Sequence, residues 1–183
     1  SRRVGEVMTA LGEAQTLTIT ADPGVTLTPA QRTANTEYQD RVDKLQRSLT
    51  GTLEQANSMR TRTQAIQRAL VDSPADVKFM AEARRFDQRV LAVLRQLRGD
   101  ETIRGDESGS ASTIQSRVGS AVQGARGLSG APTGTQTQNY TIASEDLAAQ
   151  ITALRAIEAE LRKFEQQLEA AGVPYTPGRW PQG

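Results

Sequence analysis

Apolar side chains recur every three or four residues over most of the chain, a spacing that places them on one face of an α-helix. The longest such stretch begins after Thr28 and Pro29, residue types suited to the N-cap and the first helical position. It continues to Leu70 and passes through Gly51, so its seam extends roughly 50 Å at 1.5 Å per residue. We expect one long helix that faces a partner along its whole length. The seam positions are Tyr38, Val42, Leu45, Leu49, Thr52, Ala56, Met59, Thr63, Ile66 and Leu70.

A second helix is expected directly after the first. Asp72, Ser73 and Pro74 end one helix and supply the N-cap and first position of the next. Because the link is so short, the two helices should be antiparallel. The seam of the second helix consists of Phe79, Ala83, Phe86, Val90, Val93 and Leu97.

Two further helices are predicted, a short one over 113–126 and a long one over 136–171. Gly172 and Pro174 are suited to ending the long one. The pattern therefore predicts a mainly α fold, an up-down bundle of three to four helices, two of them long. The inward positions are Ile114, Val118, Ala121, Val122 and Ala125 in the short helix, and Tyr140, Ala143, Leu147, Gln150, Leu154, Ile157, Leu161, Phe164 and Leu168 in the long one.

The first 25 residues follow a different pattern. The alternation of polar and apolar residues over 16–20 is typical of a half-buried strand, and 7–10 is suited to be its hairpin partner. A lone hairpin is marginally stable, so we expect it to complete a sheet or to lie against the helices. The predicted organisation is a short β-hairpin in 1–25, a helical bundle in 26–172 and a Pro-rich tail in 173–183.

Composition narrows the classes of function. The chain has no His and no Cys, which removes the commonest general base, thiol catalysis, disulfides and thiolate metal sites. Its 22 basic residues against 21 acidic ones lack the basic excess typical of nucleic-acid binders. No apolar run approaches the roughly 20 residues that cross a bilayer. We therefore expect no catalytic, cofactor-binding or metal-binding residues, no nucleic-acid partner and no membrane span.

Four weaker signals each have a plain interpretation beside a functional one. Acids in one loop suggest calcium but lack the EF-hand spacing. Two Arg-Gly-Asp tripeptides suggest adhesion, a sequon suggests glycosylation, and arginines along the second helix suggest an anionic partner. A solvated surface explains the acids and the arginines, short tripeptides recur by chance in loops, and the sequon falls early in the predicted helix over 136–171, beside the inward Tyr140. The four sets are Asp100, Glu101, Asp106 and Glu107; Arg98–Asp100 and Arg104–Asp106; Asn139–Thr141; and Arg84, Arg85, Arg89 and Arg95.

The tail is the most informative stretch for function. Tyr175, Arg179 and Trp180, the only Trp, lie in an irregular segment rich in Pro. In solvent the indole would expose a large apolar surface, so the aromatic residues either fold back onto the bundle or dock on a partner. We select these three residues as candidate interaction residues, with both alternatives open.

Several segments, taken in order, resemble a known family. They are Leu17–Val25, Leu97–Asp100, Ile114–Val118, Ala131–Gln136 and Leu168–Arg179. This arrangement is similar to the C-terminal region of large exported bacterial proteins with sortilin-like, sialidase-type β-propellers, which often carry the label of glycosyl hydrolases with Asp-box repeats. In that family an Ig-like strand pair follows the propeller and a helical bundle comes last.

The resemblance implies an upstream propeller and a secreted, extracellular or periplasmic location. The Asp-box pattern, Ser-x-Asp-x-Gly-x-Thr-Trp, does not occur in this sequence, so no catalytic residue is carried over. The leading hypothesis is a non-catalytic structural or interaction module that packs on its propeller or mediates assembly, including a homo-oligomer. The alternative is an accessory domain of a carbohydrate- or peptide-processing enzyme whose active site lies upstream.

Overall fold

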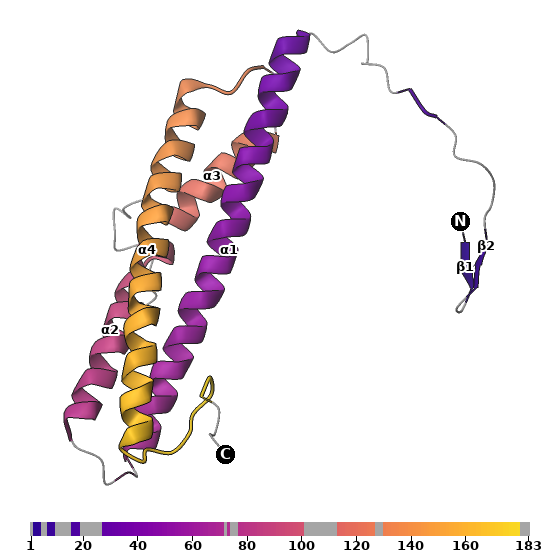
Figure 1. Cartoon of the computed structure of the whole chain (residues 1–183). Helices are drawn as coiled ribbons and strands as arrows, with labels where there is room; N and C mark the ends of the chain where they lie inside the picture. The colour runs from indigo at the N-terminus through magenta and orange to yellow at the C-terminus, as the bar shows by residue number, and fades with distance from the viewer. Residues whose placement is uncertain are drawn as a thin grey trace.

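A computed structural model of the chain describes residues 2–4, 7–9, 16–18, 27–71, 73, 77–100, 113–126 and 130–179. These residues form four helices, α1 (Pro29–Val71), α2 (Val77–Arg98), α3 (Ile114–Arg126) and α4 (Gly134–Ala170). Two short strands, β1 (Arg2–Val4) and β2 (Val7–Thr9), pair antiparallel. The fold is mainly helical, as the sequence predicts, and the helices lie side by side in a bundle (Figure 1).

Helices α1 and α4 run in the same direction. Near their starts, the Tyr38 hydroxyl donates a hydrogen bond of 3.0 Å to the backbone oxygen of Gln136. Near their ends, the Arg62 guanidinium lies 2.8 Å from the Glu165 carboxylate. The two longest helices of the described chain are therefore parallel neighbours that touch at both ends.

Helices α2 and α3 together fill the third position in the cross-section of the bundle, one after the other along its length. Helix α2 packs antiparallel to the second half of α1, and α3 continues in the same direction against its first half. The end of α2 meets the start of α3, since a Cβ at Gly99 would lie 3.3 Å from Thr113 Cγ2. The end of α3 lies beside the start of α1, where Gln39 Nε2 donates to the backbone oxygen of Ala125 over 2.9 Å. The bundle therefore has a three-helix cross-section, formed by α1, α4 and either α2 or α3.

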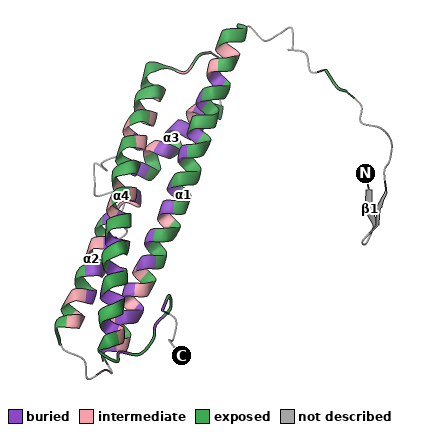
Figure 2. Cartoon of the chain, viewed as in Figure 1, coloured by how far each residue is buried: buried purple, intermediate pink, exposed green. Residues whose placement is uncertain are grey.

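The predicted apolar seams form the core. All ten seam positions of α1 and all five inward positions of α3 are buried. Helix α2 buries its seam except for Phe79, which is half-buried, and adds Leu94. Helix α4 leaves only Tyr140 and Gln150 half-buried among its predicted positions. Figure 2 shows the resulting inward stripes of buried residues.

Local sequence signals explain where the helices begin. Thr28 and Gln31 form a reciprocal capping box, in which the Gln31 N–H donates to Thr28 Oγ1 and the Thr28 N–H donates to Gln31 Oε1. Thr133 and Gln136 repeat this arrangement at the start of α4. The predicted N-cap of α1 is confirmed. Of the three residues predicted to link α1 to α2, only Ser73 is described, since residues 72 and 74 lie outside the described part.

The predicted N-terminal hairpin is not the pairing that the structure contains. Residues 16–18 are not in a strand, and the side chain of Leu17 is 83% exposed. The strand paired with β2 is β1, which precedes it, so the strands are closer in sequence than predicted. Residues 19 and 20 lie outside the described part. The alternation over 16–20 failed as a strand signal because, in the described residues 16–18, no strand or apolar surface covers it.

Truncation of a seam residue should measure how much the buried core contributes to the free energy of unfolding. Leu161 is 0% exposed in the core, and we expect Leu161→Ala to lower the free energy of unfolding by about 2–5 kcal/mol, because it leaves a cavity. Urea denaturation followed by helical circular dichroism gives this value. The same substitution at the exposed Leu17 is the control and should change it by less than about 0.5 kcal/mol.

The contact between the starts of α1 and α4 should produce a loss of stability at high pH. Burial raises the pKa of the Tyr38 phenol above its ordinary value. The neutral phenol stabilises the fold fully below the unfolded pKa of about 10, and this contribution is lost as pH rises through the higher folded pKa. Tyr38→Phe should cost about 1 kcal/mol at neutral pH and flatten the alkaline fall measured by urea denaturation. Tyr175→Phe should keep that fall, and an unchanged slope in Tyr38→Phe would contradict the assignment.

Candidate functional site

The C-terminal strap, defined here as residues 173–179, leaves the end of α4 through a Schellman motif. The Val173 N–H donates to the Leu168 oxygen and the Gly172 N–H donates to the Glu169 oxygen, both over 3.0 Å. Gly172 has a φ of +71°, which a glycine adopts without strain, and the apolar pair Val173 and Leu168 is buried. The sequence prediction of a stop at Gly172 is confirmed.

A second turn brings the strap back over the bundle. The Arg179 N–H donates to the Thr176 oxygen over 3.0 Å, with Pro177 and Gly178 at the two central positions. Gly178 has a φ of +94°, as a type II turn requires. A Cβ at Gly178 would lie 2.9 Å from Arg62 Nε, so the strap approaches α1 closely at this glycine.

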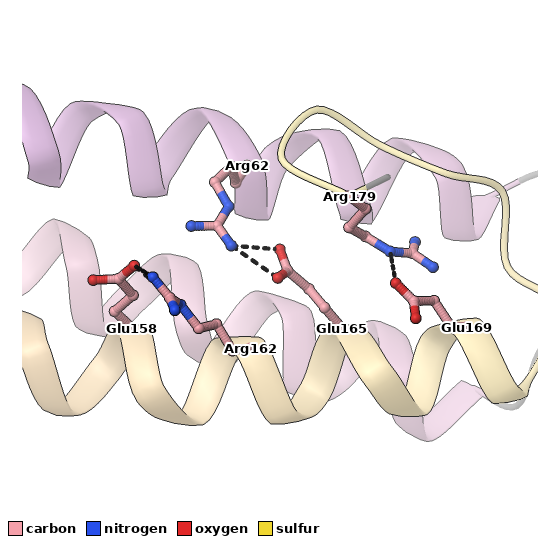
Figure 3. A network of polar contacts seen from close by, with 6 residues as sticks. All are labelled: Arg62, Glu158, Arg162, Glu165, Glu169 and Arg179. Atoms are coloured by element: carbon pink, nitrogen blue, oxygen red, sulfur yellow. Dashed lines mark hydrogen bonds and ion pairs between the residues drawn. The ribbon is translucent and has the colours of Figure 1, made fainter. Parts of the chain in front are cut away.

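Arg179 fastens the strap through contacts of its side chain, which is only 1% exposed. Its Nη1 donates to the Pro174 oxygen over 3.0 Å, its Nε lies 3.6 Å from the Glu169 carboxylate, and its guanidinium carbon lies 5.2 Å from the centre of the Tyr175 ring. Figure 3 shows Arg179 directed at Glu169. Tyr175 as a whole residue remains 47% exposed at this end of the bundle.

Ion pairs lie beside the strap between α1 and α4 (Figure 3). Arg62 Nη2 donates to both carboxylate oxygens of Glu165 at 2.9 and 2.8 Å, and the two side chains are 18% and 8% exposed. Within α4, Arg162 Nη2 donates to Glu158 over 2.7 Å, an i,i+4 pair on one face of the helix. The pair of Arg62 and Glu165 closes the seam between α1 and α4 at its C-terminal end.

Further along the same seam the two helices separate. We call this opening the α1–α4 groove, and its volume is about 400 Å³. Its floor contains Met59 and Leu154, both buried. Its lining residues are Arg47, Ser48, Gly51, Thr52, Gln55, Met59, Ile151, Leu154, Arg155 and Glu158.

The structure places the three candidate interaction residues differently. Arg179 makes its contacts within the chain, to the Pro174 oxygen, to Glu169 and to the Tyr175 ring. Both alternatives for the aromatic residues, folding back onto the bundle and docking on a partner, stay open. Tyr175 is stacked on Arg179 and still half-exposed. Trp180 lies outside the described residues. Their role as interaction residues stays a prediction.

The weaker signals are largely explained by structural contacts. Asp100 is the described member of the acidic loop set and also ends the first Arg-Gly-Asp tripeptide, and its carboxylate lies 2.9 Å from Arg95. Arg85 and Arg89 of α2 pair with Glu82 and Glu160, and the hydrogen bond from Arg89 lowers the pKa of Glu160. The remaining members, 101–112, fall outside the described chain. In the part that is described, no three acidic, His or Cys residues are grouped for a metal.

The sequon at Asn139 lies inside α4, where it was expected. The Thr141 hydroxyl donates to the Thr137 oxygen over 3.0 Å within the helix, and Asn139 is half-buried. A regular helix does not present the sequon as an exposed loop. Glycosylation is therefore not proposed.

Comparisons with protein-family models, with curated proteins and with solved structures each find no match. The resemblance to the region that follows sortilin-like propellers therefore stays a prediction. A separate property concerns membranes: among the helices of the described residues, none is both long and apolar enough to cross a bilayer.

Removal of one partner from the buried ion pair should destabilise the strap end. Glu165→Ala leaves the Arg62 charge without its acceptor, and we expect a loss of about 2–3 kcal/mol, since both side chains are mostly buried. Replacement of both residues by Leu should cost less than the single change, because no unpaired charge remains. Denaturation of the variants measures this cycle, and equal losses in both would contradict the role of charge.

Proposed function

We propose that this chain is a non-catalytic structural and interaction module of an exported propeller protein. In this proposal the bundle packs on the propeller or mediates assembly at the cell surface, outside the cytoplasm, and the strap is the contact point. The observation that carries the proposal is the half-exposed Tyr175 on a strap that Arg179 fastens to the bundle. The propeller and the location rest on the sequence resemblance alone.

The geometry of the strap supports an interaction role. Docking costs side-chain and loop entropy, and a strap that is already fixed before binding avoids much of that cost. Tyr, Trp and Arg are the residues enriched at the centres of protein interfaces. Tyr175 is presented on the fixed strap, and Trp180 follows Arg179 directly in the sequence. A Tyr presented at the end of a rigid bundle, with a Trp five residues further along the sequence, is suited to a hydrophobic pocket on a partner.

The bundle itself supports a scaffolding role. Helix α1 has 43 residues and α4 has 37, which correspond to about 65 and 55 Å of helix at 1.5 Å per residue. Their apolar stripes are covered by the other helices of the same chain. Such a rod holds the strap at a fixed distance from whatever is attached to the opposite end.

The proposal is tested with the purified chain and with the propeller that we expect its gene to encode, produced separately. Light scattering gives the mass of the chain in solution, and calorimetry gives its affinity for the propeller. We expect either a stable oligomer or saturable binding, weakened about tenfold or more by Tyr175→Ala and by Trp180→Ala. Val71→Ala is the control, because Val71 is an exposed apolar residue at the end of α1.

Two results would overturn the proposal. One is a monomer without affinity for the propeller, and the other is hydrolytic activity of the isolated chain on carbohydrate or peptide substrates. A change in the activity of the propeller on addition of the chain would instead support the alternative of an accessory enzyme domain.

A further inference from the structure

The α1–α4 groove is an opening in a seam that is closed on both sides. Toward the start of α4 the seam is closed by Tyr38 and Tyr140, whose ring centres are 6.2 Å apart, and toward its end by Arg62 and Glu165. Between these closures, residues 47–59 of α1 face α4 across the groove, about 18 Å of helix at 1.5 Å per residue. The opening therefore has the length of about three helical turns.

The floor of the groove is apolar and its rim carries positive charge. Met59 and Leu154 form the floor with the half-buried Ile151. Arg47 on α1 and Arg155 on α4 are exposed at the rim, and neither forms an ion pair or hydrogen bond within the described residues.

The carboxylate of the groove does not neutralise these arginines. Glu158 also lines the groove, but it accepts hydrogen bonds from Arg162, whose charge offsets it. Further along the same two helices, Arg62 and Arg162 each have a carboxylate partner. The groove is thus the part of this seam where two arginines stay unpaired above an apolar floor.

Gly51 adds a feature that the packing of this chain does not account for. A glycine inside a helix costs about 1 kcal/mol relative to Ala. A Cβ at Gly51 would meet no atom within 4 Å, so no described contact requires the missing side chain. The missing side chain instead keeps the groove open for a close approach from outside.

We propose that the α1–α4 groove binds an acidic amphipathic helix of a partner protein. Apolar side chains of the partner would lie on Met59 and Leu154, and its carboxylates would pair with Arg47 and Arg155. A partner helix bound in the groove would convert the three-helix cross-section of the bundle into a four-helix one. The inference deepens the proposed interaction role by naming a second surface, separate from the strap, and the chemistry of what it binds.

The shape of the groove favours a helix over a small amphiphile. The groove is bounded by two parallel helices and is open to solvent along its length, whereas small ligands are usually enclosed on most of their surface. Its two unpaired charges lie on opposite walls. A helix with carboxylates on both borders of an apolar stripe matches this arrangement of charge.

The test uses a synthetic helical peptide of about four turns, with Leu at positions i, i+3, i+4 and i+7 and Glu beside them, and a matched peptide with Lys in place of Glu. Selective labelling of methionine methyl groups provides the readout, because the chain has three Met. We expect the Glu peptide to shift the Met59 signal saturably and to leave Met80 of α2 unchanged, and the Lys peptide to shift neither. The shift should weaken as salt is raised.

Variants identify the groove as the binding site. Arg47→Glu with Arg155→Glu should weaken binding about tenfold or more, since both arginines are exposed and unpaired. Gly51→Met should block the groove without loss of fold. Gly119→Met is the matched control, because Gly119 is also a helical glycine with open space at its Cβ, but it lines a separate groove between α1 and α3.

Three outcomes would overturn the inference. They are the absence of a Met59 shift at millimolar peptide, equal binding of the Glu and Lys peptides, and binding that Gly51→Met leaves unchanged. A Met59 shift with dodecanoate but not with the Glu peptide would also overturn it, in favour of a small amphiphile. If association through Tyr175 and Trp180 persists while the peptide does not bind, the groove inference fails and the proposed function does not.

Discussion

Burial of the apolar stripe of α1 is the interaction on which the rest of the structure depends. This helix contacts each of the other three, and α2 and α3 succeed each other along it. Apolar burial contributes about 25 cal/mol per Å² of surface removed from water, so a stripe of ten buried positions far outweighs any one polar contact. Compared with this stripe, the capping boxes, the ion pairs and the strap make smaller contributions to the stability of the bundle.

Periodicity predicted the core well because burial on a helix follows directly from spacing. Every predicted position on α1 is buried, and Phe79 and Tyr140, at the edges of their stripes, are half-buried. The predicted strand over 16–20, of which residues 16–18 are described, failed there for the complementary reason. Alternation is a weak signal over so few residues, and it acquires meaning only when a neighbouring surface covers one face.

The candidate site depended on contacts that spacing does not reveal. Arg62 and Glu165 are 103 residues apart, and nothing in either neighbourhood indicates the pair. The tail sequence Thr176–Arg179 does encode a Pro-Gly turn, which predicts a reversal of the chain. It does not reveal that Arg179 is used to fasten the strap rather than to meet a partner. The groove was also missed, because it depends on how far apart α1 and α4 lie at Gly51.

The central claim is that α1 passes through Gly51 as one rigid unit held along its whole length. Native-state hydrogen exchange measures this most directly, because it gives an opening free energy for each backbone amide. The account predicts equal values at Val42 and Ile66, on either side of Gly51, both matching the free energy of global unfolding. A value at Val42 several kcal/mol below that at Ile66 would contradict it, since the half of α1 that packs on α3 would then open by itself.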